Sequence, residues 1–291
     1  MMTAENILSL IPGYIFASGS AALAQFMILF GPLLILSFLL NALARSIGRT
    51  CLGLLKPTLF LILLGWLGTT VHELGHVIFA LLFFRKISDV KWFSLDPWDP
   101  NPGYVRYARE GNLLQKFGDF FIGLGPLLVG AVVIYIAAWG LLGSGTFAGM
   151  DQTALTGDTF TLRTVGLLIQ RIFNSAGAAL RGVFTGASHT PAAVFAFLYI
   201  TLSISSAMTL SSADIGIVRN GFAVSLTLIF LFNLVTFWSG NYIDLLIGWI
   251  APYYDMFYSV LIFGLIITFI LWLLLLPISV LVSDNRAFRK G

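Results

Sequence analysis

Residues 65–84 read GWLGTTVHELGHVIFALLFF, and this stretch has two features from which the fold can be predicted. It is apolar over about 20 residues, which is the length that crosses a bilayer as a helix. It also contains His72, Glu73 and His76, side chains that lipid cannot solvate. A charged group at mid-membrane costs roughly 2.5–3.5 kcal/mol on insertion scales, so this cluster indicates a metal ion or a water-filled cavity.

The composition of the whole chain agrees with a membrane protein. Of its 291 residues, 58% are hydrophobic and 10% are charged, whereas soluble domains carry roughly 25% charged residues. A soluble enzyme and a disordered chain are therefore excluded. The net charge is only +3 and the basic residues are scattered, so no nucleic-acid partner is expected. The single cysteine, Cys51, excludes an internal disulfide framework.

Six apolar stretches are long enough to cross a bilayer, and no internal repeat or appended soluble domain is visible. They are residues 21–43, 57–84, 117–142, 191–211, 221–243 and 256–282. We therefore expect an all-α membrane protein with one domain over residues 1–291, a bundle of about six transmembrane helices. Residues 7–17 are too short to cross and are expected at the interface. An amphipathic segment from Arg163 to Arg181 predicts a helix in the interface or packed on the bundle.

The loops predict an orientation and a small hairpin. Six of the 16 Lys and Arg residues lie on the side of loops 44–56, 143–190 and 244–255, and ten lie on the side of the N-terminus, 85–116, 212–220 and 283–291. The positive-inside rule then places both termini in the cytoplasm, with a bacterial cytoplasmic membrane as the expected location. The turn-rich sequence DPWDPNPG (96–103) lies between β-type stretches 90–93 and 104–107, which predicts a cytoplasmic β-hairpin.

The cluster in the second span has the pattern His-Glu-x-x-His, which is typical of zinc hydrolases. His72 and His76 are four residues apart, so on a helix they lie on one face and can bind one Zn²⁺ together. Zinc lowers the pKa of a water that it binds to about 7, and a carboxylate can accept the proton as that water attacks a carbonyl. Glu73 is placed for that role. The alternative interpretation is a pair of buried, hydrogen-bonded histidines.

A zinc site of this kind needs a third protein ligand. The expected topology puts the only other histidine, His189, at the opposite side of the membrane. Among the carboxylates on the side of the motif, Asp214 is our first choice, Asp119 the second and Glu110 the third. Asp214 could instead be an exposed residue at a helix end or pair with Arg219, and Asp119 could be a carboxylate at a helix N-terminus.

Three stretches resemble the site-2 protease superfamily of intramembrane zinc metallopeptidases. They are His72-Glu73-Leu74-Gly75-His76, Pro102-Gly103-Tyr104-Val105-Arg106 and Gly123-Leu124-Gly125-Pro126, in the order of the family and within residues 57–142. The resemblance implies cleavage of membrane-spanning or membrane-proximal segments of proteins within the bilayer. It also implies that His72 and His76 bind zinc and that Glu73 is catalytic.

The chain departs from the family pattern at the third ligand. The usual Leu-Asp-Gly motif is absent, and Phe232-Asn233-Leu234 is similar only to the beginning of the stretch that precedes it. This similarity keeps Asp244 as a further candidate ligand, although the expected topology places it on the far side. The sequence around Asp214 resembles the ligand stretch of shorter members. No PDZ-like insertion is visible, so the resemblance is to a minimal member.

Two other functions remain open at this stage. One is a membrane zinc protease of the prenyl-protein type, with Glu110 as the third ligand. The other is a membrane scaffold or transporter subunit with a metal site and no catalysis. Glu73 distinguishes the last of these, because a site that only binds metal has no need of that carboxylate.

Overall fold

The structure is a computed structural model that describes residues 4–54, 56–99, 101–108, 111–144, 146–147, 162–186, 189–236, 238–240 and 242–288. The helices are α1 (Ala4–Leu54), α2 (Pro57–Phe60), α3 (Trp66–Leu82), α4 (Leu113–Leu142), α5 (Leu162–Thr185), α6 (Pro191–Ala207), α7 (Ser212–Thr236) and α8 (Tyr242–Phe288). A π-helical turn, Leu61–Gly65, joins α2 to α3, and the strands are β1 (Ile87–Lys91) and β2 (Tyr104–Tyr107).

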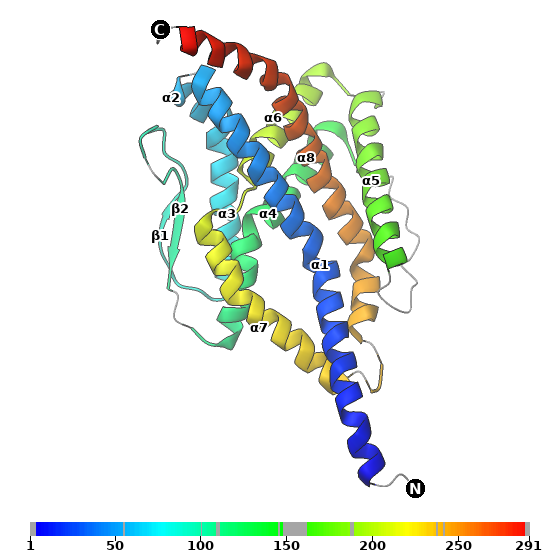
Figure 1. The fold of residues 1–291 in the computed structure, drawn as a ribbon. Helices are drawn as coiled ribbons and strands as arrows, with labels where there is room; N and C mark the ends of the chain where they lie inside the picture. The colour runs from blue at the N-terminus through cyan, green and yellow to red at the C-terminus, as the bar shows by residue number, and fades with distance from the viewer. Residues whose placement is uncertain are drawn as a thin grey trace.

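The chain is a helical bundle with one small sheet, as the apolar runs predict (Figure 1). Among the described residues, five helical segments are long and apolar enough to cross a membrane, and they are Ile11–Cys51, Pro57–Leu82, Leu113–Leu142, Ser212–Thr236 and Met256–Pro277. The fold class of an all-α membrane protein is therefore confirmed. Residues 7–17 continue α1 rather than forming a separate interfacial segment, because a proline inside an apolar helix costs one backbone hydrogen bond without ending the helix.

Helices α6 and α7 run in the same direction through the bundle. Tyr199 of α6 accepts a hydrogen bond from Trp66, near the beginning of α3, while Asp214 of α7 contacts His76 further along the same helix. Further along α6, the carbonyl of Ala207 lies 2.8 Å from Nδ1 of His72, so α6 runs in the direction of α3. Helix α7 contacts α4 first at Gly123 and then at Phe120, so it runs against α4 and in the same general direction as α3. The four residues that connect α6 to α7, Met208–Ser211, are not helical. Such a break at membrane depth is tolerated where protein or a water-filled cavity surrounds it.

This path corrects the expected topology. The stretches 191–211 and 221–243 do not make two opposite crossings, and residues 212–220 are not a loop but the first turns of α7. With one reversal fewer, α1 begins and α8 ends at opposite ends of the bundle (Figure 1). The structure therefore gives no support to the expectation that both termini share one side of a membrane. The orientation inferred from Lys and Arg lacks support for the same reason, because it counted both ends of the chain on one side.

The predicted hairpin is present and lies beside α3 rather than beyond the end of the bundle (Figure 1). Its strands are antiparallel, with Val90 opposite Val105, and the register is irregular between Ile87 and Asp89. The first strand occupies 87–91 instead of the expected 90–93. An ion pair between Lys91 and Asp99 spans the connecting loop, and this bond holds the pKa of the Asp99 carboxyl below its usual range.

The amphipathic segment forms α5, which extends along α8 (Figure 1). Its inward face is made of small and branched apolar residues, and Ala176, Ala179 and Val183 are all buried. Of the two interpretations that the sequence leaves open, a helix packed on the bundle is the one found.

A close crossing of α3 and α4 lies at the level of the histidines. A Cβ atom added at Gly75 would lie 2.5 Å from the carbonyl carbon of Gly125, and one added at Gly125 would lie 2.5 Å from the oxygen of Gly75. Only glycine permits the two backbones to approach this closely. The crossing brings the His-Glu-x-x-His helix against the Gly-Pro step of α4.

Candidate metal and catalytic site

Three side chains from two helices converge in the interior of the bundle. The Nε2 atoms of His72 and His76 are 3.2 Å apart. Carboxylate oxygens of Asp214 lie 3.2 Å from Nε2 of His76 and 3.7 Å from Nε2 of His72. Three atoms bound to one zinc ion at 2.0–2.2 Å in tetrahedral geometry are separated by about 3.4 Å. The donor set and its spacing thus fit a tetrahedral zinc site.

The protonation of the two imidazoles follows from their outer contacts. Nδ1 of His72 lies 2.8 Å from the carbonyl oxygen of Ala207, and Nδ1 of His76 lies 2.9 Å from that of Ile122. A carbonyl oxygen can only accept a hydrogen bond, so each Nδ1 carries the proton. In the neutral rings, both Nε2 atoms then present lone pairs to each other and to a carboxylate. Such a cluster of acceptors is stable only around a cation or an added proton.

Both of these carbonyl groups are free because a helix is interrupted. Ile122 is four residues before Pro126, and a proline has no N–H to donate to that carbonyl within α4. Ala207 is the last residue of α6, where carbonyl groups have no partner inside the helix. Each interruption therefore supplies one acceptor that orients one histidine. The close approach of α3 to α4 and α6 brings the two acceptors within reach.

Asp214 owes its position to the beginning of α7. Its amide donates to Oγ of Ser211 at 3.1 Å, and its carboxylate accepts from the amide of Ser211 at 2.8 Å. This reciprocal pair is a capping box, which defines where the helix begins. Asp214 is buried, so its charge requires a partner, and the two histidines are the groups that face it. The alternative pairing with Arg219 is not found.

Glu73 lies beside the three converging side chains but is not one of them. It is buried and faces the hairpin, where Gly103 packs against it. A Cβ atom at Gly103 would lie only 2.8 Å from Oε1 of Glu73. The carboxylate is thus held between α3 and the residue that precedes β2.

A cavity of about 580 Å³ opens onto this site. One wall carries His72, Glu73 and His76, a second is formed by the first turns of α7, and residues 101–107 of the hairpin form the third. Within the part of the chain that the structure describes, strand β2 pairs with β1 alone, and residues 104–107 of β2 also line the cavity. The space is large enough for several residues of an extended chain together with water.

The other candidate ligands lie elsewhere. Asp119 makes an ion pair of 2.6 Å with Arg85, a buried side chain that also donates to the carbonyl of Ala108. Asp244 is in the first turn of α8. Asp214 is in the first turn of α7, so the length of α7 separates the two carboxylates. Glu110 lies outside the described residues. His189 contacts the carbonyls of Val183 and Leu142 near the far end of α4.

Sequence reasoning missed Ser211, Ala207 and Ile122. A signal for Ser211 was present, because Ser211-Ser212-Ala213-Asp214 has the spacing of a capping box and predicts a helix that begins at Ser212. Backbone carbonyl groups have no sequence signature of their own. Pro126 does predict that the carbonyl of Ile122 lacks a partner within the helix. That this carbonyl contacts His76 is visible only in the structure, where α3 crosses α4. The chain was compared with models of known protein families, with curated proteins and with solved structures, and no match was found.

Proposed function

We propose that this protein is a zinc-dependent peptidase that cuts a membrane-spanning or membrane-proximal segment of another membrane protein. The observation that carries the proposal is the convergence of two bare Nε2 atoms and a buried carboxylate next to Glu73. A metal site alone would account for His72, His76 and Asp214. The additional carboxylate at the cavity favours hydrolysis over a scaffold or transporter role. A bacterial cytoplasmic membrane remains a prediction for its location.

His72, His76 and Asp214 would hold Zn²⁺ at the wall of the larger cavity. When bound, the ion would supply a Lewis acid that polarises a carbonyl and makes water more acidic. The Nδ1 hydrogen bonds keep both imidazoles in the orientation and tautomer that metal binding needs. The capping box keeps the carboxylate of Asp214 turned towards them.

Glu73 would move the proton. Its carboxylate accepts a proton from the attacking water while the new C–O bond forms, and it then donates that proton to the amine nitrogen as the C–N bond breaks. Burial between α3 and Gly103 keeps bulk water from competing for the carboxylate. The proton is thereby transferred within the site.

The substrate would bind as an extended strand. A helix hides its peptide groups in its own hydrogen bonds, so the segment must unwind locally before a carbonyl can reach the site. The free edge of β2 can pair with such a segment by main-chain hydrogen bonds, the mode known as β-augmentation. Since Gly103 contacts Glu73, a strand that extends β2 would pass directly over the catalytic carboxylate.

The test is cleavage by purified protein in detergent with one equivalent of zinc. The probes are synthetic single-span peptides whose helices are weakened by glycine, and the products are identified by mass spectrometry. We expect cleavage by the wild type and a rate at least 100-fold lower for Glu73→Gln with zinc retained, as for loss of a general base. Lys116→Gln, an exposed change on α4, is the matched control. Equal rates for Glu73→Gln and wild type would exclude the peptidase and favour a metal site without catalysis.

A further inference from the structure

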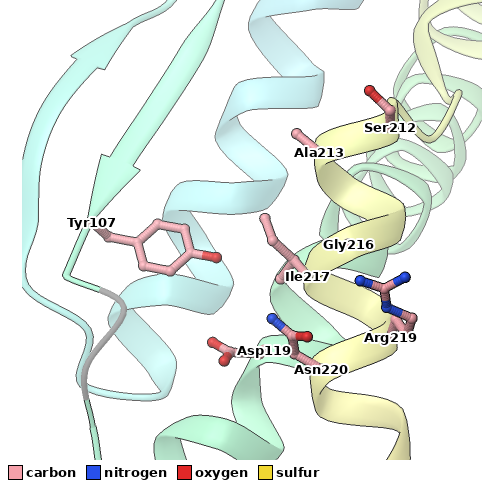
Figure 2. Close-up of a pocket in the computed structure, with 8 residues that line it drawn as sticks. All are labelled: Tyr107, Asp119, Ser212, Ala213, Gly216, Ile217, Arg219 and Asn220. Carbon is pink, nitrogen blue, oxygen red and sulfur yellow. The ribbon is translucent and has the colours of Figure 1, made fainter.

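A second, smaller cavity adjoins the proposed active site. Its volume is about 290 Å³, and it shares Tyr107, Ala213 and Ile217 with the larger cavity. Figure 2 shows its walls, with Tyr107 reaching from β2 towards α7 and Arg219 and Asn220 on α7. A chain that lies between β2 and α7 would therefore pass from the metal site to this cavity.

The charges around the smaller cavity favour an anion. Asp119 lines it from α4 (Figure 2), but its carboxylate is paired with the buried Arg85. Arg219 is exposed, and within the described part of the chain no carboxylate lies within ion-pair distance of it. Arg219 therefore brings to the wall of this cavity a positive charge that no carboxylate of the described residues pairs with. Arg219 and the amide of Asn220 add hydrogen-bond donors that suit a carboxylate.

The spacing sets the distance of this cavity from the reacting bond. Arg219 follows Asp214 by five residues, which is about 7.5 Å along a helix. Tyr107 follows Gly103 by four residues, which is about 13 Å along a strand. An extended substrate rises about 3.3 Å per residue, so the cavity is reached roughly two to four residues from the bond at Glu73.

We propose that the smaller cavity is a specificity subsite for an acidic side chain, Asp or Glu, located two to four residues from the cleaved bond of the substrate. The inference rests on the proposed peptidase function, and it deepens that function by naming a substrate class. Arg219 is the specificity-determining residue. Asp119, paired with Arg85, lines the same cavity from α4.

Binding to the Glu73→Gln protein tests the subsite without requiring turnover. The probes are fluorescent extended peptides of one neutral sequence in which a single Glu is moved along the chain, each paired with its Gln counterpart. Affinity is measured by anisotropy in uncharged detergent. We expect one position at which Glu binds about tenfold more tightly than Gln, the size of one charge-assisted hydrogen bond. In Arg219→Gln this preference disappears, whereas Arg45→Gln on α1 retains it.

A charge reversal provides the second arm. In Arg219→Glu, Lys should replace Glu as the preferred residue at the same peptide position. Equal affinity for the Glu and Gln peptides at every position would overturn the inference, and so would a preference that persists in Arg219→Gln. A third outcome separates the two proposals. If the preference for Glu depends on Arg219 but the wild-type protein cleaves no peptide, the acidic subsite stands and the peptidase function is excluded.

Discussion

At the scale of single residues, the site depends on two carbonyl groups that belong to no helix. The carbonyl of Ile122 is free because Pro126 lacks an N–H, and that of Ala207 is free because α6 ends there. Each accepts the Nδ1 proton of one histidine, and each Nε2 is thereby left as a ligand. Pro126, which would ordinarily be interpreted as a kink, is thus a positioning residue for His76.

Replacing Pro126 with alanine tests this role. The alanine N–H would donate to the carbonyl of Ile122 inside α4, and His76 would lose its outer hydrogen bond. Loss of such an orienting partner typically costs 10–100-fold in metal affinity. We therefore expect zinc affinity, measured by competition with a chelator, to fall about tenfold or more in Pro126→Ala. Pro277→Ala, at an exposed proline of α8, is the control, and equal affinity in the two variants would contradict the role of Pro126.

At the scale of helices, the close crossing of α3 and α4 brings the histidines to their acceptors. Gly75 and Gly125 are in backbone contact there, and Ile122 lies one turn away on the same face of α4. The beginning of α7 supplies the third ligand through its capping box. A shift of α7 would therefore move Asp214 away from the two histidines, and a shift of α4 would remove the acceptor of His76.

A side chain at the crossing should damage both stability and metal binding. In Gly125→Ala the new Cβ would meet the carbonyl of Gly75 at 2.5 Å, so the helices must separate. Overpacking of this kind typically costs 1–3 kcal/mol. We expect a lower midpoint of thermal unfolding in detergent together with weaker zinc binding. Gly140→Ala, in the same helix with no atom within 4 Å of the new Cβ, should match the wild type, and a Gly125→Ala protein as stable as Gly140→Ala would refute the tight crossing.

At the scale of the whole molecule, the broken path of α6 and α7 determines where the chain ends lie. Apolar runs and turn residues were sufficient to predict the bundle, the hairpin and the placement of His72, Glu73 and His76 on one helix. They could not predict that α6 and α7 run in the same direction, because hydropathy gives the length of an apolar stretch and not the direction in which it crosses. The four residues Met208–Ser211 separate two apolar helices without reversing the chain. The capping box at Ser211 indicates that a new helix begins at Ser212. The apolar runs instead place residues 191–211 in one span and residues 212–220 in a loop.

The opposite placement of the chain ends can be measured by labelling. In a Cys51→Ser background, single cysteines at Ala4 and Ala287 are treated with an impermeant thiol reagent in intact and permeabilised spheroplasts. We expect one cysteine to react in intact spheroplasts and the other only after permeabilisation, since α1 begins and α8 ends at opposite ends of the bundle. If both cysteines react from the same side, the path of α6 and α7 is wrong.

The most direct test of the proposed metal site is the zinc content of the purified protein, measured by mass spectrometry for a series of single variants. We predict about one zinc ion per chain in the wild type. The same content is expected in Glu73→Gln and Asp119→Asn, because neither substitution removes a ligand. We predict that zinc is lost in His72→Ala, His76→Ala and Asp214→Asn, whose side chains converge in the structure. Full zinc in His72→Ala, or a loss confined to Asp244→Asn, would contradict the central claim.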